Sequence, residues 1–155
     1  MTEAVADDRE DYLRLDLQVC FPLYAASNLF GRLYRPVLAK LGLTYSQYLV
    51  MLVLWQQTPQ SVGALGGRLH LDSGTLTPLL KRMETAGLVT RQRDVADERR
   101  VLVGLTEPGE ALRLAARDVP STLASGLSLS PQELSDLRHT VQHLVAVLAT
   151  AEEHS

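Results

Sequence analysis

The sequence predicts a mostly α-helical protein with one small β-hairpin, folded as a single domain. Apolar residues recur at helical spacing along most of the 155 residues. Near the middle of the chain, two short helical segments lead directly into two runs rich in β-branched residues. The composition, 46% hydrophobic and 21% charged, is that of a globular protein.

The charge is distributed unevenly along the chain. The formal net charge is −3, yet residues 17–104 carry ten Lys and Arg against five Asp and Glu. A locally basic surface is what phosphate binding requires, so the overall acidity does not exclude nucleic acid. We expect residues 1–12 to form an acidic disordered tail. They lack the apolar segment of a signal peptide, so we do not expect them to be one. One cysteine excludes an intrachain disulfide, and no segment is long and apolar enough for a membrane span, so we predict a cytoplasmic protein.

Residues 13–60 are helical in pattern. Pro22 and Pro36 interrupt the first stretch, which predicts kinked or paired helices there. Thr44 and Gln47 have the spacing of a capping box that starts the next helix. We expect Trp55, together with Phe21 and Phe30, to belong to the core.

Residues 61–87 predict a helix-turn-helix. Ser61 caps a short helix, a turn follows at residues 70–72, and the second helix ends before Gly87. The second helix has an inward apolar face made of Leu76, Leu79, Leu80 and Met83. Its outward face carries the hydroxyls and cations that suit a DNA major groove, namely Ser73, Thr75, Thr77, Lys81 and Arg82.

Pro78 conflicts with a helix interior, where proline costs about 3 kcal/mol. We expect the helix to begin near Ser73, which would place Pro78 in the first turn and point the free N–H groups at a phosphate.

Residues 88–94 and 99–105 predict a hairpin, the wing of a winged helix-turn-helix. Its arginines, which would enter a minor groove or contact phosphates, are Arg91, Arg93, Arg99 and Arg100. Asp97 precedes Arg99 by two residues and is expected to hold its guanidinium.

Residues 106–150 are again helical in pattern. Residues 121–129 are rich in small residues and predict a looser connection, and Ser130 with Glu133 forms a second capping box. The last helix has an apolar stripe formed by Leu134, Leu137, Val141, Leu144, Val145 and Leu148. Because helix-turn-helix proteins bind paired half-sites, we expect the N- and C-terminal helices to form a homodimer on a pseudo-palindromic, double-stranded operator.

Several segments, taken together, resemble the MarR family of winged-helix repressors. The order of helices, the wing sequence DER at residues 97–99 and LTEPG at residues 105–109 are similar to that family. Four further segments resemble its organic hydroperoxide regulators: LDLQVCFPLY at 15–24, YRPVL at 34–38, LTYSQYL at 43–49 and LDSGTLTP at 71–78. The resemblance covers roughly residues 13–150. It implies one MarR-type domain, with dimerisation helices in residues 13–60 and 106–150 and the DNA-binding region in residues 61–105.

The resemblance also implies that Cys20 is a peroxide-reactive thiol. Tyr34 and Tyr45 match the tyrosines that hydrogen-bond the sulfur, reaching across from the partner subunit, and Tyr24 matches a further tyrosine near that pocket. Attack on an organic hydroperoxide gives a sulfenic acid. A second, C-terminal cysteine found in one subgroup is absent. The sulfenic acid must therefore react with an external low-molecular-weight thiol, form a sulfenamide or be oxidised further, and only the first two outcomes are readily reversed.

The sequence also permits other interpretations of Cys20 and of the function. A lone cysteine among apolar residues is by itself more often an inert core residue. The alternative function is a MarR-type repressor gated by a non-covalently bound small aromatic ligand. A peroxidase acting at Cys20 is a further rival, but the DNA-binding elements favour a regulator over an enzyme. His139 and His143 have metal-ligand spacing without a third ligand, so we predict no metal and no cofactor.

Overall fold

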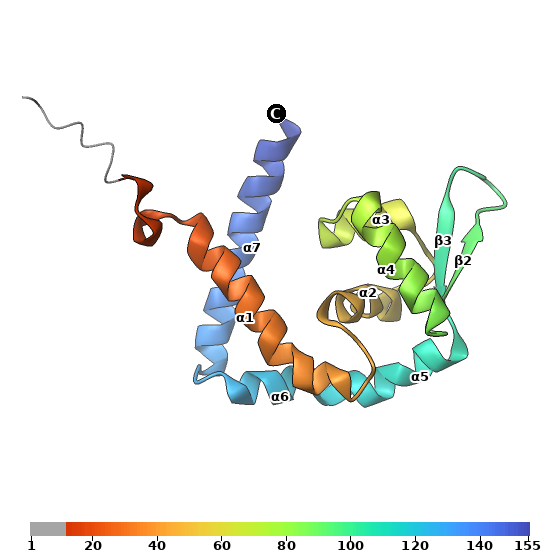
Figure 1. The fold of residues 1–155 in the computed structure, drawn as a ribbon, viewed down its shortest axis with the longest axis horizontal. Helices are drawn as coiled ribbons and strands as arrows, with labels where there is room; N and C mark the ends of the chain where they lie inside the picture. Colours follow the sequence, from red (N-terminus) through yellow and green to blue (C-terminus); the bar gives the residue numbers. More distant parts are fainter. Residues whose placement is uncertain (1–11) are drawn as a thin grey trace, which may run out of the picture. The chain divides into compact units, whose positions relative to one another are not determined.

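The computed structural model describes residues 12–155, so the expected acidic tail lies almost wholly outside the described part. The chain forms two compact units, one up to Val119 and one from Pro120 to Ser155. The first unit contains η2 (Leu15–Leu17), α1 (Cys20–Ala39), α2 (Tyr45–Gln56), β1 (Gln60–Ser61), α3 (Val62–Leu69), α4 (Ser73–Thr85), β2 (Val89–Arg93), β3 (Val101–Leu105), α5 (Glu107–Ala115) and η3 (Ala116–Asp118) (Figure 1). The second contains α7 (Pro131–Glu153) and nearly all of α6 (Val119–Gly126), which begins at the boundary.

α1 is one uninterrupted helix of 20 residues. The predicted pairing of two shorter helices is therefore wrong. Pro22 is the third residue of the helix, where a backbone N–H has no partner within the helix and its loss costs little. Pro36 lies inside the helix, one turn before its end, so the helix continues in spite of one missing backbone hydrogen bond.

The end of α1 is fixed by Gly42. Its φ of 68° is left-handed, a conformation that glycine adopts without steric cost. The N–H of Leu43 donates to the carbonyl of Leu38 at 3.1 Å, and the N–H of Gly42 donates to that of Ala39 at 3.1 Å. This pair of bonds is a Schellman motif, which turns the chain sharply toward α2.

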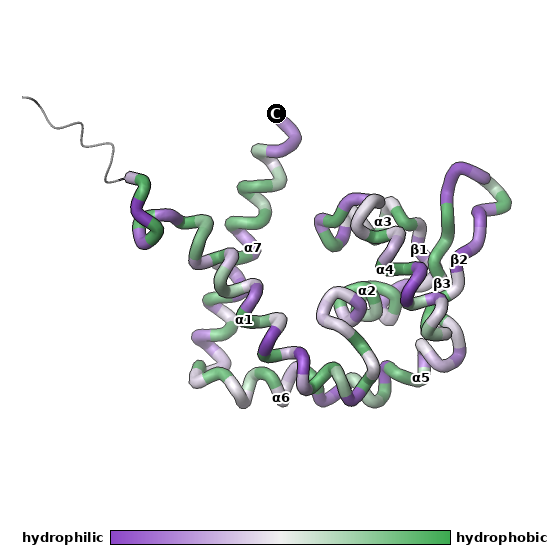
Figure 2. The backbone as a smooth tube through the Cα atoms, viewed as in Figure 1, coloured by the Kyte–Doolittle hydropathy of each residue, from purple (hydrophilic) through white to green (hydrophobic). Residues whose placement is uncertain are grey.

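α2 is the central helix of the first unit. It begins with the predicted capping box, in which Thr44 accepts from the N–H of Gln47 and the Gln47 side chain accepts from the N–H of Thr44. Its tube is predominantly hydrophobic in Figure 2. Residues on more than one side of α2 are buried, namely Tyr48, Val50, Met51, Val53, Leu54 and Trp55. A helix that is apolar on most sides is packed on most sides, so α2 forms the core on which α3, α4 and α5 lie.

α3 and α4 form the predicted helix-turn-helix. Ser61 caps α3 by accepting from the N–H of Ala64 at 3.1 Å. His70, with a left-handed φ of 54°, makes the turn. A side chain on Gly66 would clash with the carbonyl oxygen of Leu71, only 2.6 Å from the position of a Cβ. The turn is therefore tight enough to require glycine at that position.

Pro78 lies deeper in α4 than expected. The helix does begin at Ser73, but Pro78 is its sixth residue and lies beyond the first turn. The carbonyl of Gly74 consequently has no N–H donor at the usual position. Burial of the apolar face of α4 offsets this loss, because Leu76 and Leu80, on either side of Pro78, are fully buried.

The sheet has three antiparallel strands in the order β1-β3-β2. β2 and β3 form the predicted hairpin, with Val89 opposite Leu105 and Arg93 opposite Val101. β1, which the sequence did not predict, adds two residues to the other edge of β3, pairing Gln60 with Val103. The short third strand fastens the base of the wing to the start of α3.

Gly109 is the point at which α5, the wing and α2 meet. Its N–H donates to the hydroxyl of Thr106, the cap of α5, at 3.1 Å. Its carbonyl accepts a buried hydrogen bond of 3.0 Å from the indole N–H of Trp55. The carbonyl oxygen of Leu88 occupies the space where a side chain would project. Only glycine permits this close approach.

The second unit consists of two helices. α6 occupies most of residues 121–129, so the predicted loose connection there is wrong. Most residues of α6 have low helix propensity, and burial of Leu123 stabilises the helix instead. α7 begins at the predicted capping box of Ser130 and Glu133, with Pro131 as its first residue. α7 has no buried residue, and its apolar stripe is exposed or half-buried. Across residues 12–155, none of the helices combines the length and apolarity needed to cross a bilayer.

Replacing Gly109 with alanine is expected to lower the free energy of unfolding by at least about 2 kcal/mol, because the new methyl group would displace the Leu88 carbonyl. Urea unfolding at fixed protein concentration measures the effect. Gly67→Ala is the matched control, since nothing lies within 4 Å of that Cβ position and helix propensity favours alanine by about 1 kcal/mol. Equal stability of the two variants would contradict the role of Gly109.

Candidate nucleic-acid interface and redox site

α4 presents one polar face to solvent. Its opposite face is buried as predicted, through Leu76, Leu79, Leu80 and Met83. The outward side chains are Ser73, Thr75, Lys81 and Arg82, which are exposed, and Thr77, which is half-buried. Neither Lys81 nor Arg82 has an ion-pair partner among residues 12–155. Both cations are therefore available to an external anion.

The first turn of α4 differs from the expected phosphate site. The carboxylate of Asp72 caps it, accepting from the N–H of Thr75 at 2.7 Å. A negative charge at the positive end of the helix dipole stabilises the helix. It also occupies the position in which we expected a phosphate, so the cations farther along α4 are the better candidates for phosphate contact.

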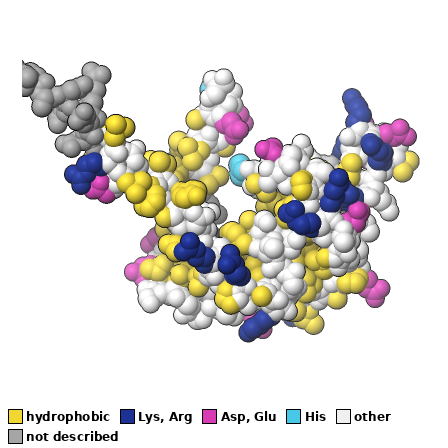
Figure 3. Space-filling model, viewed as in Figure 1, with side chains coloured by type: hydrophobic (Ala, Val, Ile, Leu, Met, Phe, Trp, Pro, Cys, Tyr) yellow, Lys and Arg dark blue, Asp and Glu magenta, His cyan; other side chains and the backbone are white. Residues whose placement is uncertain are grey.

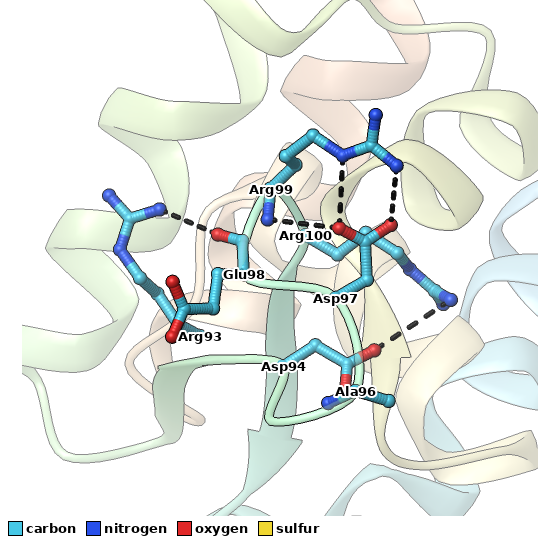
Figure 4. A network of polar contacts seen from close by, with 7 residues as sticks. All are labelled: Arg93, Asp94, Ala96, Asp97, Glu98, Arg99 and Arg100. Atoms are coloured by element: carbon cyan, nitrogen blue, oxygen red, sulfur yellow. Dashed lines mark hydrogen bonds and ion pairs between the residues drawn. The ribbon is translucent and has the colours of Figure 1, made fainter.

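The tip of the wing is organised by ion pairs (Figure 4). The guanidinium of Arg99 donates to both carboxylate oxygens of Asp97, at 3.1 and 3.3 Å. These bonds lower the pKa of Asp97, so the carboxylate stays charged at neutral pH. The Arg99 side chain is nonetheless 91% exposed. Asp97 thus orients a guanidinium that projects into solvent, as predicted.

Two other wing arginines are used within the hairpin. Arg93 donates to the carbonyl oxygen of Glu98 at 2.9 Å. Arg100 lies 3.7 Å from the carboxylate of Asp94. These contacts hold the two strands together at the tip, and Arg99 is more exposed than either Arg100 or Arg91.

Arg91 joins the wing to α4. Its guanidinium donates to one carboxylate oxygen of Glu84 at 3.1 Å, and its backbone N–H donates to the other at 3.1 Å. Its side chain is only 23% exposed, and its Nε is buried without a partner. Arg91 was predicted to be one of the DNA-binding cations, and the sequence pattern did not indicate its partner Glu84. The feature of the sequence that could have indicated this pairing is Gly87, whose turn brings the end of α4 beside the start of β2.

Cys20 is the first residue of α1, and it is exposed. Tyr24, one turn farther along, is 69% exposed. The apolar side chains near Cys20 in the sequence are exposed as well, namely Leu17, Val19, Phe21 and Leu23. Figure 3 shows hydrophobic side chains covering the visible surface at the N-terminal end of α1.

Phe21 and Phe30 were predicted to be core residues with Trp55. Trp55 is buried, but Phe21 and Phe30 are exposed. The sequence pattern does mark an apolar helix face there, but it does not tell whether the same chain covers that face.

Tyr34 and Tyr45 come together between α1 and α2. Their ring centroids lie 4.7 Å apart, and the ring of Tyr48, a residue that the sequence pattern did not indicate, lies 5.7 Å from that of Tyr34 at a tilt of 41°. Burial, followed by the neighbouring phenols, raises the pKa of Tyr34 to about 12. Burial also raises the pKa of Tyr45. Both hydroxyls therefore stay protonated at neutral pH and can act as hydrogen-bond donors.

Cys20 and Tyr34 cannot meet within one chain. They lie on the same continuous helix, 14 residues apart, and a rise of 1.5 Å per residue separates them by about 21 Å. The tyrosine pair can approach a cysteine only if that cysteine belongs to another copy of the chain.

No group of three His, Cys, Asp or Glu side chains within residues 12–155 could hold a metal ion. His139 lies on α7 with its Nδ1 2.7 Å from the carbonyl oxygen of Ser135, and both residues belong to one helical turn. The histidine spacing noted in the sequence therefore assembles no ligand set in the described chain.

Comparison with known proteins identifies the class of this chain. A family described as transcriptional regulator SarA/Rot matches residues 32–113. The organic hydroperoxide resistance transcriptional regulator of Bacillus subtilis (strain 168) is 46% identical over 144 residues, covering 93% of this chain and 96% of that protein. The chain belongs to the MarR/SarA family of winged helix-turn-helix transcriptional regulators. It is a regulator and not an enzyme.

Solved structures of AbfR from Staphylococcus epidermidis are similar to this regulator. Reduced AbfR bound to DNA has a TM-score of 0.79 and 36% identity, covering 92% of this chain and 98% of that one. Overoxidized AbfR bound to DNA has a TM-score of 0.67 and 40% identity, covering 86% and 98%. Disulfide-formed AbfR has a TM-score of 0.61 and 39% identity, covering 88% and 96%.

Removing the Tyr34 hydroxyl should make the regulator less sensitive to alkaline pH. A raised pKa means that the folded state binds the phenol proton more tightly than the unfolded chain does. This contribution to stability is complete below pH 10 and is lost as the pH rises toward 12. Tyr34→Phe should therefore lose less stability than the wild type across this window, as measured by urea unfolding at several pH values. Tyr24→Phe, at an exposed ring, serves as the control, and parallel curves for all three proteins would contradict the prediction.

Proposed function

We propose that this protein is a transcriptional repressor that senses organic hydroperoxides by oxidation of Cys20 and is thereby released from its operator. The observation that carries the proposal is the exposed thiol of Cys20 in an apolar surface. Support comes from the 46% identity to a regulator of organic hydroperoxide resistance. The protein acts in the cytoplasm, where its DNA target lies.

DNA binding follows from the geometry of α4 and the wing. α4 enters the major groove with its outward hydroxyls and cations, Ser73, Thr75, Thr77, Lys81 and Arg82. The wing enters the adjacent minor groove with Arg99, which Asp97 holds in position. Arg93 and Arg100 add positive charge at the tip, and Arg91 contributes through its bond to Glu84. The DNA-bound state of the similar AbfR supports this mode.

A homodimer covers the exposed apolar faces. In the first unit, η2 and α1 expose large apolar side chains such as Leu17, Phe21 and Leu29. In the second unit, α7 exposes Val141, Val145 and others. Monomeric proteins seldom leave apolar surface of this extent in water. Two copies joined through these helices would present two α4 helices to the half-sites of a pseudo-palindromic operator.

The redox step needs only the peroxide and a thiolate. The Cys20 thiolate attacks the hydroxyl-bearing oxygen of the peroxide and the O–O bond breaks, so that the sulfur becomes a sulfenic acid. The other oxygen leaves as an alkoxide, which takes a proton from water and becomes the alcohol. Tyr34 and Tyr45 of the partner subunit donate hydrogen bonds to the sulfur, which stabilises the thiolate. Exposed Tyr24 borders the same thiol.

Recovery requires a second molecule. With one cysteine per chain, a low-molecular-weight thiol displaces water from the sulfenic acid and forms a mixed disulfide, which further thiol reduces. The added bulk at the start of α1 changes the dimer contacts, and with them the spacing of the two α4 helices.

Replacing Cys20 with serine should abolish peroxide-induced release from DNA while leaving DNA binding intact. The measurement is a gel shift on the DNA upstream of the regulator's own gene, with and without cumene hydroperoxide. Release of the wild type alone, reversed by added thiol, is the expected result. Equal release of wild type and Cys20→Ser would instead favour a repressor gated by a bound aromatic ligand.

Tyr45→Phe should slow peroxide-induced release in the same gel shift without changing DNA affinity, because it removes one hydrogen-bond donor to the sulfur.

Arg99→Ala should weaken DNA binding and reduce its dependence on salt. A guanidinium in the minor groove lies between the two phosphate backbones, and losing the charge that neutralises one phosphate lowers the slope of log affinity against log salt by about 0.9 per protomer. Fluorescence anisotropy at several salt concentrations measures the slope. Arg91→Ala is the informative comparison, because its guanidinium is bound to Glu84: the variant should be less stable and retain the wild-type salt slope. An unchanged slope and affinity for Arg99→Ala would remove Arg99 from the interface.

A further inference from the structure

One apolar side chain stands alone at the tip of the wing. Val95 is 99% exposed, more than any other large hydrophobic residue within residues 12–155. It lies in the loop between β2 and β3, apart from the apolar faces of η2, α1 and α7 that the proposed dimer covers. A single exposed valine is common on protein surfaces. The loop that carries this one and the charges beside it give it a specific use.

The loop around Val95 is held by its own hydrogen bonds (Figure 4). The carboxylate of Asp94 accepts from the N–H of Ala96 at 2.9 Å, and the N–H of Asp94 donates to the carbonyl of Arg100 at 2.9 Å. The N–H of Arg100 donates in turn to the carbonyl of Asp97 at 3.0 Å. Because the main chain is fixed on both sides of Val95, the loop presents the valine to solvent in a defined position.

The exposed charges of the same loop are mainly positive. Arg99 pairs with Asp97, and Arg100 pairs with Asp94; in each pair the guanidinium is the more exposed partner. An apolar group beside exposed cations matches the minor groove of DNA, where phosphates line the rims and the deoxyribose walls are apolar. Proteins that bind this groove frequently insert apolar side chains into it.

We propose that Val95 enters the minor groove beside Arg99 and excludes the amino group of guanine, so that it selects A·T pairs beneath the wing. In the minor groove, a G·C pair differs from an A·T pair by the exocyclic N2 amino group of guanine. Valine offers no acceptor to this group, so its contact with a G·C pair would leave a desolvated N–H donor unpaired. Adenine carries only a C–H at that position, which a methyl group can contact. Val95 is then a specificity-determining residue that forms no hydrogen bond.

This inference rests on the proposed mode of DNA binding, and its test changes one chemical group in the minor groove. 2,6-Diaminopurine paired with T keeps the major-groove edge of adenine and adds the minor-groove amino group of guanine. It replaces A, one pair at a time, in the DNA upstream of the regulator's own gene, at the pairs that the bound protein protects from hydroxyl radicals. Fluorescence anisotropy with the reduced protein measures the affinity for each duplex. We expect the wild type to bind about tenfold more weakly when the substituted pair lies beneath the wing, the scale of one buried unpaired donor.

Two substitutions of Val95 should remove most of this loss. Val95→Ala makes room for the amino group, and Val95→Thr supplies an acceptor oxygen in nearly the same shape, so both should reduce the loss to about threefold or less. Leu114→Thr is the matched control, because Leu114 is an exposed apolar residue of α5 outside the wing. It should keep the loss seen in the wild type. Thermal unfolding checks that all three variants are folded.

Equal losses in the wild type and in both Val95 variants would overturn the inference and assign the preference for A·T to Arg99 and the width of the groove. A wild type that loses no affinity at any substituted pair would overturn it too. Arg99→Ala in the same assay separates the inference from the mode of binding: if this variant binds more weakly while the Val95 variants match the wild type, the inference alone fails. If Arg99→Ala leaves affinity unchanged, the wing lies outside the groove and both fail. No oxidant is present, so failure of Cys20 to sense peroxide would not alter the result.

Discussion

The continuity of α1 is the constraint on which the proposed sensing chemistry depends. A 20-residue helix is a stiff rod, and it holds Cys20 at one end and Tyr34 near the other. Because the rod cannot fold back on itself, a single chain holds the thiol and its potential hydrogen-bond donors apart. Sensing through these groups therefore requires association of two chains, which links the redox site to the oligomeric state.

Internal pairing decides which cations face the solvent as free charges. In the wing, carboxylates and a backbone carbonyl accept from Arg91, Arg93, Arg99 and Arg100, so the hairpin is rigid but partly neutralised. On α4, Lys81 and Arg82 have no such partners within the described chain. The net charge of −3 conceals this division. The local arrangement of charge, and not the total, makes an acidic protein suitable for binding DNA.

The sequence predicted those parts of the fold that local chemistry determines. Capping residues fixed the starts of α2, α3 and α7, and the buried leucines of α4 fixed its orientation. Predictions failed where tertiary contacts prevail over local rules. Pro22 and Pro36 did not divide α1, residues 121–129 formed α6, and the two-residue strand β1 exists only because β3 lies beside it.

The candidate sites were predictable in kind but not in arrangement. The pairing of Asp97 with Arg99 depends on a spacing of two residues and was foreseen. The hydrogen bond that Arg91 donates to Glu84 and the contact between the rings of Tyr48 and Tyr34 depend on chain reversals that bring distant segments together. The solvent exposure of Phe21 and Phe30 could not be foreseen either, because an apolar helix face is the same in sequence whether its own chain or a second one covers it.

The carboxylate of Glu84 has a mechanical consequence. One oxygen binds the guanidinium of Arg91 and the other binds its backbone N–H, so the last turn of α4 is clamped to the first residues of the wing. Because the helix and the hairpin are joined through both main-chain and side-chain atoms, they move as one rigid body. In the proposed mode of DNA binding, a rearrangement that tilts α4 out of the major groove would also withdraw the wing from the neighbouring minor groove. Detachment of a protomer from DNA would then be cooperative, with no intermediate that keeps hold by the wing alone.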